Sequence, residues 1–161
     1  MNYIIDNCSL VNLANCNLLT ACVNHPAHSF FITPLVCDKE CTSCKEEVDA
    51  LIASGHLSKL PFVPNIADFI KLGKDFSIDD GECESILACQ EYDYALISDD
   101  SAARRCADKV LGTSKRTGSL GLIKQLVSVG SIACAQAIAA YHAMKNAGGF
   151  LPKIDPRAEL C

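Results

Sequence analysis

The chain has 161 residues, half of them apolar and a fifth charged, so it is long enough to bury one core and too apolar to be disordered. Its net charge of −5 argues against a non-specific clamp on nucleic acid, because such clamps are usually basic. It leaves metal-dependent nucleases open, because their sites gather carboxylates around metal ions. No apolar stretch is long enough to cross a membrane.

Strands and helices alternate along the chain. Apolar, β-prone runs predict strands at 2–6, 30–33 and 94–98, and a short one between 111 and 115. Helical spacing predicts helices from Ser9, as the cap, to about 18, and at 35–53, 66–72 (one or two turns), 79–92, 101–111, 118–129 and 132–146. Residues 57–64 are expected to be extended or irregular, and 150–161 to form an extended tail.

This alternation predicts the fold class. Strands that alternate with helices form βαβ units, which give a mostly parallel sheet with helices on both faces. We therefore predict a three-layer α/β/α fold in a single domain over 1–161, with its core at about 2–147 and a tail at 148–161. In such sheets the functional side chains lie at the carboxyl ends of the strands.

Carboxylates follow several of the predicted strands. Asp6 ends the first strand, and Asp99 and Asp100 end the strand at 94–98. Other acids follow the second strand or open a helix, namely Asp38, Glu40, Glu82 and Glu84. Carboxylates around one cleft suit Mg²⁺ or Mn²⁺, which activate water and stabilise charge on a phosphoryl group. The alternative is helix capping, which fits Glu82, Glu84 and Asp100 and explains less of Asp6.

Five short segments carry a resemblance to a known family. They are Asp6-Asn7-Cys8-Ser9, Gly81-Glu82-Cys83-Glu84-Ser85-Ile86, Ser98-Asp99-Asp100 with Ala103-Arg104, Thr117-Gly118-Ser119-Leu120-Gly121, and Gly149-Phe150-Leu151. In this order, over about residues 3–152, they resemble the PIN domain. The resemblance implies an α/β/α fold that cleaves RNA with Mg²⁺ or Mn²⁺, often as the toxin of a toxin–antitoxin pair and commonly as a dimer.

The resemblance also implies roles for individual residues. The implied catalytic acids are Asp6, Glu40, Glu84, Asp99 and Asp100. All of them except Glu40 are implied metal ligands, with the hydroxyls of Ser98 and Ser119 nearby. Glu40 is included because it stands six residues after Pro34, as the family's second acid does. Cys8 stands where the family often has Ser, Thr or Asn, so we expect a polar contact to be lost there.

Basic residues follow the last of these acids. The candidates for contacts with RNA phosphates are Arg104, Arg105, Lys115, Arg116 and Lys124, and the alternative for them is a solvated helix face. We predict a metal-dependent ribonuclease with RNA as its substrate, and an antitoxin and a second copy of the chain as partners. One alternative is a PIN-like binding module without catalysis. Another is a phosphatase of the haloacid dehalogenase type, which needs a second Asp where this chain has Cys8.

Eleven cysteines are the unusual feature of the composition. The odd count, the length of the chain and an N-terminal apolar run that stops at Asp6 argue against a secreted disulfide scaffold. We therefore expect free thiols and a cytoplasmic location. Zinc binding by Cys22, His25, His28 and the 37–44 cysteines is an alternative, but we favour Cys37, Cys41, Cys89 and Cys106 as core residues.

Overall fold

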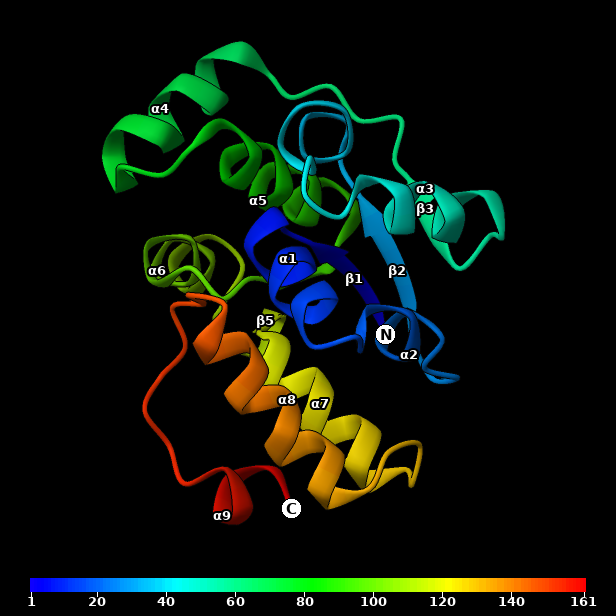
Figure 1. The fold of residues 1–161 in the computed structure, drawn as a ribbon. Helices are drawn as coiled ribbons and strands as arrows, with labels where there is room; N and C mark the ends of the chain where they lie inside the picture. The colour runs from blue at the N-terminus through cyan, green and yellow to red at the C-terminus, as the bar shows by residue number, and fades with distance from the viewer.

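A central parallel sheet organises the molecule, and the computed structural model describes all residues from 1 to 161 (Figure 1). Its five strands run in the order β3-β2-β1-β4-β5, and every pairing is parallel. The strands are β1 (Asn2–Ile5), β2 (Ser29–Ile32), β3 (Leu57–Lys59), β4 (Ala95–Ile97) and β5 (Arg116–Thr117). Since all five strands run the same way, their carboxyl ends meet at one edge of the sheet.

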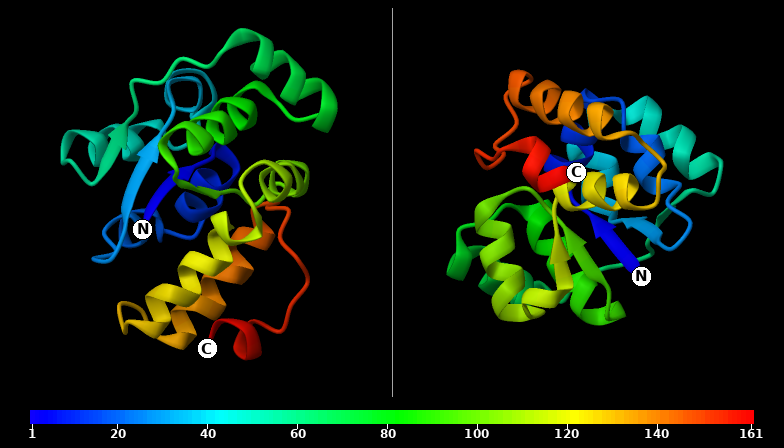
Figure 2. Two further views of the ribbon diagram at one scale, coloured as in Figure 1. Left: turned by 180° about the vertical axis from the view of Figure 1, so that it is seen from behind. Right: turned by 90° about the horizontal axis from the view of Figure 1, so that it is seen from below.

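Helices cover both faces of this sheet, which confirms the predicted α/β/α fold. They are α1 (Asn7–Asn15), α2 (Leu19–Val23), α3 (Lys45–Ala53), α4 (Ile66–Phe76), α5 (Asp80–Tyr92), α6 (Ser101–Val110), α7 (Ser119–Ser128), α8 (Cys134–Asn146) and α9 (Pro156–Leu160). The right-hand view of Figure 2 shows the sheet between α5 and α6 on one side and α7 and α8 on the other. None of the helices combines the length and the apolar character that crossing a membrane requires.

The sheet separates two apolar clusters. Ile4 of β1 and Leu96 of β4 pack into the smaller cluster, which the side chains of α5 and α6 complete. Their neighbours Ile5 and Ile97 point the opposite way, into the larger cluster with α1, α7 and α8. Successive side chains of a strand alternate between faces, and both faces are covered here, so the strands are apolar throughout.

The predicted helix at 35–53 is interrupted in its middle. Residues Val36–Glu40 form a π-helical turn, Cys41 leaves the helical conformation, and α3 begins only at Lys45. A hydrogen bond from the backbone N–H of Gly81 to the Glu40 side chain, 2.9 Å long, ties the end of this turn to α5. The cysteines around the break do not share one helix, although Cys37, Cys41 and Cys44 are all buried.

Other predicted elements shift at their ends. The cap of α1 is Asp6 rather than Ser9, because its carboxylate accepts a hydrogen bond from the first N–H of the helix. Helix α4 continues to Phe76, beyond the one or two turns expected, after Asn65 caps its start. The strand expected between 111 and 115 lies at Arg116–Thr117, because Thr113–Lys115 form a 3-10 turn first.

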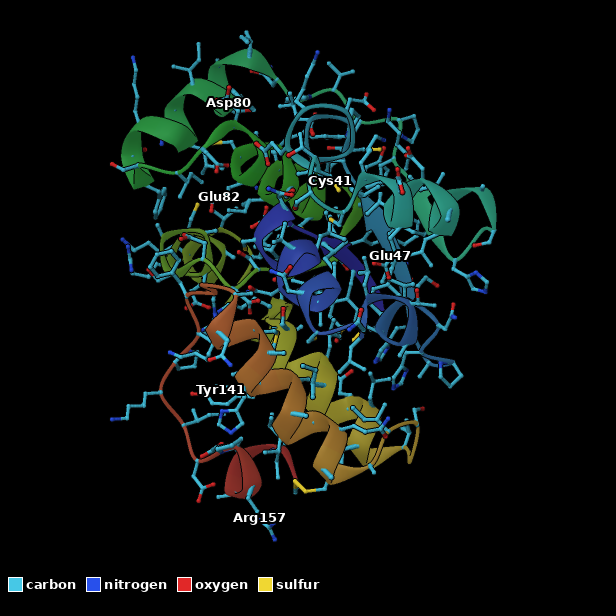
Figure 3. The ribbon with its side chains drawn as sticks, in the orientation of Figure 1. Cys41, Glu47, Asp80, Glu82, Tyr141 and Arg157 are labelled. Carbon is cyan, nitrogen blue, oxygen red and sulfur yellow. A yellow bond between two sulfur atoms is a disulfide. The ribbon has the colours of Figure 1, made fainter.

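The end of the chain returns to the body of the protein. Leu151 and Leu160 are buried in the larger cluster, and α9 replaces the extended tail expected there. Cys161 forms a disulfide with Cys134 at the start of α8, with Cα atoms 5.4 Å apart (Figure 3). The expectation of free thiols throughout is therefore wrong for these two, since burial of Leu160 brings the thiols together. The other nine cysteines are free, and the four expected in the core are buried.

Candidate active site

Asp6 is the carboxylate at the carboxyl end of the central strand β1. It is 2 % exposed, and its Oδ2 accepts hydrogen bonds from Cys8 and Ser98 at 3.1 and 2.9 Å. Burial raises the pKa of Asp6 to about 6, although these hydrogen bonds act in the opposite direction. A carboxylate buried without a cationic partner is energetically costly, so Asp6 is a site where a bound cation would be stabilised.

Cys8 keeps a polar contact in the position where a loss is expected. Its thiol donates to Oδ2 of Asp6, and its sulfur accepts a hydrogen bond from the backbone N–H of Asp99 at 3.3 Å. Burial and the negative charge of Asp6 raise the pKa of the thiol far above its ordinary value. Cys8 therefore stays a neutral S–H donor, and the expected loss of the contact is wrong.

Glu40 stands at the end of the π-helical turn, facing the start of α5. The backbone N–H of Gly81 donates to its Oε1, and a side chain at position 81 would overlap the Glu40 carboxylate. A larger residue at this position would therefore displace the Glu40 carboxylate from its hydrogen bond with the backbone. The pKa of Glu40 is raised to about 7, first by burial and then by the negative charges of Asp79 and Asp6.

Glu82 is a second acid of α5, and the family resemblance implies a catalytic role for Glu84 rather than for Glu82. It is 9 % exposed, and its pKa is raised to about 8 by burial. The negative charges of Asp6, Asp79 and Asp100 raise it further, so Glu82 belongs to the same electrostatic group as Asp6. Glu82 also completes a capping box with Asp79, whose backbone N–H donates to Oε2 of Glu82 at 3.1 Å. Figure 3 shows Glu82 on the side of α5 that faces α6.

Glu84, the glutamate chosen from the sequence, lies in different surroundings. Residues two apart on a helix do not face each other, so Glu82 and Glu84 point in different directions. Glu84 is 3 % exposed, and its Oε2 accepts a hydrogen bond from the backbone N–H of Leu35 at 2.7 Å. Burial raises the pKa of Glu84 most, the charge of Asp38 raises it further, and that of Lys59 lowers it. Glu84 thus stabilises the segment that follows β2 through its hydrogen bond with Leu35.

The neighbouring aspartates after β4 have different partners. Oδ2 of Asp99 accepts hydrogen bonds from Asn12 at 2.8 Å and from the Ser119 hydroxyl at 2.5 Å. Its Oδ1 accepts another from the backbone N–H of Ser119, so Asp99 joins α1 to the start of α7. Asp100 caps α6 through Oδ1 alone, which accepts from Ala102 and Ala103, and its Oδ2 has no hydrogen-bond partner.

The negative charges of Asp6 and Asp100 raise the pKa of Glu82, and that of Asp6 also raises the pKa of Glu40, so these four acids are called here the acid cluster. The carboxylates of Glu84 and Asp99, which the sequence also proposed, accept hydrogen bonds from Leu35 and from Asn12 and Ser119, and their part in the site stays a prediction. In the conformation described, no group of three or more His, Cys, Asp or Glu side chains is spaced to hold a metal ion. All five ion pairs of the chain involve other acids. Hard oxygen donors with uncompensated charge fit a divalent cation such as Mg²⁺ or Mn²⁺.

Basic side chains line the surface next to Asp99. A hollow of about 600 Å³, called here the basic hollow, is lined by Arg104, Arg105, Arg116 and Lys145 together with Asp99. Lys124 lies further along, in an adjoining hollow of about 330 Å³ that also includes Arg104 and Arg116. The largest hollow, of about 760 Å³, lies beside α4 and contains none of the acid cluster.

Two of the five predicted basic residues already have acidic partners. Lys115 pairs with Asp93 at 2.5 Å and lines none of the hollows beside Asp99. Arg116 lines the basic hollow but forms two hydrogen bonds with Asp108, at 2.5 and 3.0 Å. Lys145, which the sequence did not suggest, joins the group because the end of α8 returns to the site.

The acid cluster makes stability depend on pH. The pKa of Asp6 rises from 3.8 to about 6 on folding, and those of Glu40 and Glu82 rise to about 7 and 8. The native state therefore binds protons more tightly than the unfolded chain, so this stabilisation is present at low pH and is lost as pH rises. We expect the free energy of unfolding to fall between about pH 4 and pH 8, with about 3 kcal/mol from Asp6.

Urea unfolding at pH 5 and pH 8 measures this dependence. The Asp6→Asn variant, which cannot titrate at that position, should show a smaller difference between the two pH values. Asp38→Asn serves as the control, because the pKa of Asp38 is lowered by its partner Lys59 and lies outside the acid cluster. Stability that rises from pH 5 to pH 8 would contradict the expectation.

Comparison with known proteins agrees with the fold. A family model described as a PIN domain matches residues 2–154, which covers all five strands and eight of the nine helices. Comparisons with curated proteins and with solved structures gave no match. PIN domains are generally nucleases, and the acids at the carboxyl edge of the sheet are suited to that chemistry. From the match over nearly its whole length, the chain belongs to the PIN-domain family.

Proposed function

We propose that the protein is a Mg²⁺- or Mn²⁺-dependent endoribonuclease whose active site is the acid cluster. The observation that carries this proposal is a pair of buried acids without an ion-pair partner in a PIN-type fold, Asp6 at the carboxyl end of β1 and Glu82 at the start of α5. Asp6, Glu82 and Asp100 would hold the ion. When bound, the ion supplies an activated water and stabilises charge on the phosphate.

The remaining groups have chemical tasks that their surroundings support. Glu40, with a pKa raised to about 7, is able to accept a proton near neutral pH, as a general base does. Ser98 and Cys8 donate to Oδ2 of Asp6 and hold its carboxylate in one orientation. Arg104 and Arg105 in the basic hollow suit the phosphates that flank the cleaved bond.

A paired substitution on α5 tests this assignment. Glu82→Gln should lower cleavage of a single-stranded RNA oligonucleotide in Mn²⁺ by about 100-fold, because it removes a proposed ligand of the ion. Glu84→Gln should retain most of the activity, because a glutamine oxygen still accepts the hydrogen bond from Leu35. Initial rates of the two variants and of the wild-type protein, with and without EDTA, give the comparison. Equal rates for the two variants, or cleavage that persists in EDTA, would contradict the proposal.

A second candidate is a PIN-like binding module without catalysis. One observation favours it, because Asp6 is 2 % exposed and its carboxylate already accepts three hydrogen bonds. Purified protein that cuts no RNA in millimolar Mn²⁺, and that binds no Mn²⁺ in calorimetry, would support this candidate. The toxin–antitoxin role, an antitoxin partner and a homodimer stay predictions from the family resemblance.

A further inference from the structure

Phe150 is a large aromatic side chain with almost no cover. It is 95 % exposed, the highest exposure among the large apolar residues of the chain. A single exposed apolar residue needs no explanation by itself. Two further features give the position of Phe150 a meaning. Its turn packs against Asn12, and the residue lines two hollows.

The turn that carries Phe150 is tied to the site. Gly148 adopts a left-handed conformation with φ +90°, and the backbone N–H of Gly149 donates to the carbonyl of Met144 at 2.9 Å. A side chain at position 149 would lie 2.5 Å from Oδ1 of Asn12, so only glycine allows this approach. Asn12 in turn donates to Asp99 at 2.8 Å. The turn is thereby held against the residues that follow β4.

Phe150 lies between two neighbouring hollows, and Asp99 lines both of them. On one side is a hollow of about 290 Å³, called here the site hollow, whose lining includes Cys8, Asp99 and Asp100. On the other side is the basic hollow with Arg104, Arg105 and Lys145. Phe150 lines both of them. An exposed aromatic ring therefore stands where the hollow that contains Asp100 meets the hollow that contains Arg104, Arg105 and Lys145.

We propose that Phe150 stacks on an unpaired base of the RNA strand and positions the adjoining phosphate at the acid cluster. This inference rests on the proposed function. An aromatic ring next to cationic side chains is the arrangement that binds single-stranded nucleic acid, because every base has a face that can stack. Arg104 and Arg105 neutralise the phosphates on the far side of the ring, while the polar side chains of the site hollow receive the strand on the near side. Duplex RNA keeps its bases paired and offers none to Phe150.

The composition of the chain makes this stacking directly visible. The protein has no tryptophan, so Phe150→Trp creates a single fluorescent reporter at the proposed contact. Val129→Trp is the matched control, because Val129 is 51 % exposed and follows the far end of α7, about 15 Å from its start. In EDTA, which prevents cleavage, single-stranded RNA should quench the fluorescence of Phe150→Trp and leave that of Val129→Trp unchanged. Duplex RNA of the same sequence should quench neither variant.

Binding measurements complete the test. In EDTA, Phe150→Ala should bind the single-stranded oligonucleotide about 10-fold more weakly than the wild-type protein, whereas Phe150→Trp keeps its affinity. Equal quenching in the two tryptophan variants, unchanged affinity of Phe150→Ala, or fluorescence that changes with protein concentration alone would overturn the proposal. The last of these results would indicate contact with a second copy of the chain. Neither the fluorescence nor the binding measurement needs a metal ion or cleavage. Both can therefore be interpreted even if the protein proves not to be a nuclease.

Discussion

Replacing Asp6 by asparagine is expected to reduce RNA cleavage by roughly 1000-fold or more, because a central ligand of the proposed metal ion is lost. The fold should survive, because asparagine is a good helix cap and still accepts the hydrogen bond from Asn7. The carboxylate is charged at the expense of stability, since burial raises its pKa to about 6. The variant should therefore be at least as stable as the wild-type protein at pH 8.

Cleavage rates in Mn²⁺ and urea denaturation at pH 8 give the two results separately. Asp38→Asn is the control, because Asp38 is an exposed acid that pairs with Lys59 at 2.6 Å outside the acid cluster. It should retain the wild-type rate. A cleavage rate of Asp6→Asn close to that of the control would remove Asp6 from the active site, whereas a folded and inactive variant agrees with its proposed role.

Asp99 is expected to matter for folding more than for catalysis. Asp99→Ala removes the acceptor of three hydrogen bonds and leaves donors of Asn12 and Ser119 without partners. We expect the free energy of unfolding to fall by about 3 kcal/mol, because unsatisfied donors near the interior add to the loss of charged hydrogen bonds. Urea denaturation measures this change.

Asp100→Ala, at the adjacent position, is the comparison. It removes only the cap of α6, so we expect a loss of about 1 kcal/mol in stability together with a large loss of cleavage. Asp99→Ala should thus mainly lower stability, whereas Asp100→Ala should mainly lower the cleavage rate. If Asp100→Ala proved less stable than Asp99→Ala, or if it cleaved RNA at the wild-type rate, the distinction between the two aspartates would be wrong.

Much of the fold follows from local sequence patterns. The apolar runs that end at Asp6 and at Asp99 mark the two central strands, and parallel pairing brings their carboxyl ends together. This rule predicts that Asp6, Asp99 and Asp100 lie at one edge of the sheet. It could not separate Asp99 from Asp100, because both follow the same strand and only their hydrogen-bond partners differ.

Features that depend on distant contacts could not be predicted in this way. The helical spacing of Cys37 and Cys41 continues past the point where the Glu40 side chain meets Gly81, and that contact between distant segments goes with the break in the helix. Likewise, both glutamates of the Gly-Glu-x-Glu segment stand at the start of α5, and only their surroundings in the fold separate them. The charge of Asp6 raises the pKa of Glu82, whereas the backbone N–H of Leu35 donates to Glu84. The capping box that fixes Glu82 could have favoured it, since Asp79 precedes it by three residues.

The contact between the C-terminal segment and α8 is the clearest example of a feature that depends on distant residues. Two prolines in the tail predict an extended segment, and the odd number of cysteines favours free thiols. Burial of Leu160 brings Cys161 to Cys134, which lies 27 residues earlier. The Phe150 turn lies beside Asn12 because it directly follows the end of α8. No pattern within either segment predicts these pairings.

The position of a bound Mn²⁺ ion tests the acid cluster most directly. Crystals of the protein soaked in Mn²⁺ should show an anomalous difference peak within about 2.1 Å of a carboxylate oxygen of Asp6, with Glu82 or Asp100 as a second ligand. Crystals of Asp6→Asn treated in the same way should show no such peak. No peak beside Asp6 in the wild-type protein at millimolar Mn²⁺, or one held only by exposed acids such as Asp38, would contradict the assignment of this cluster as the metal site.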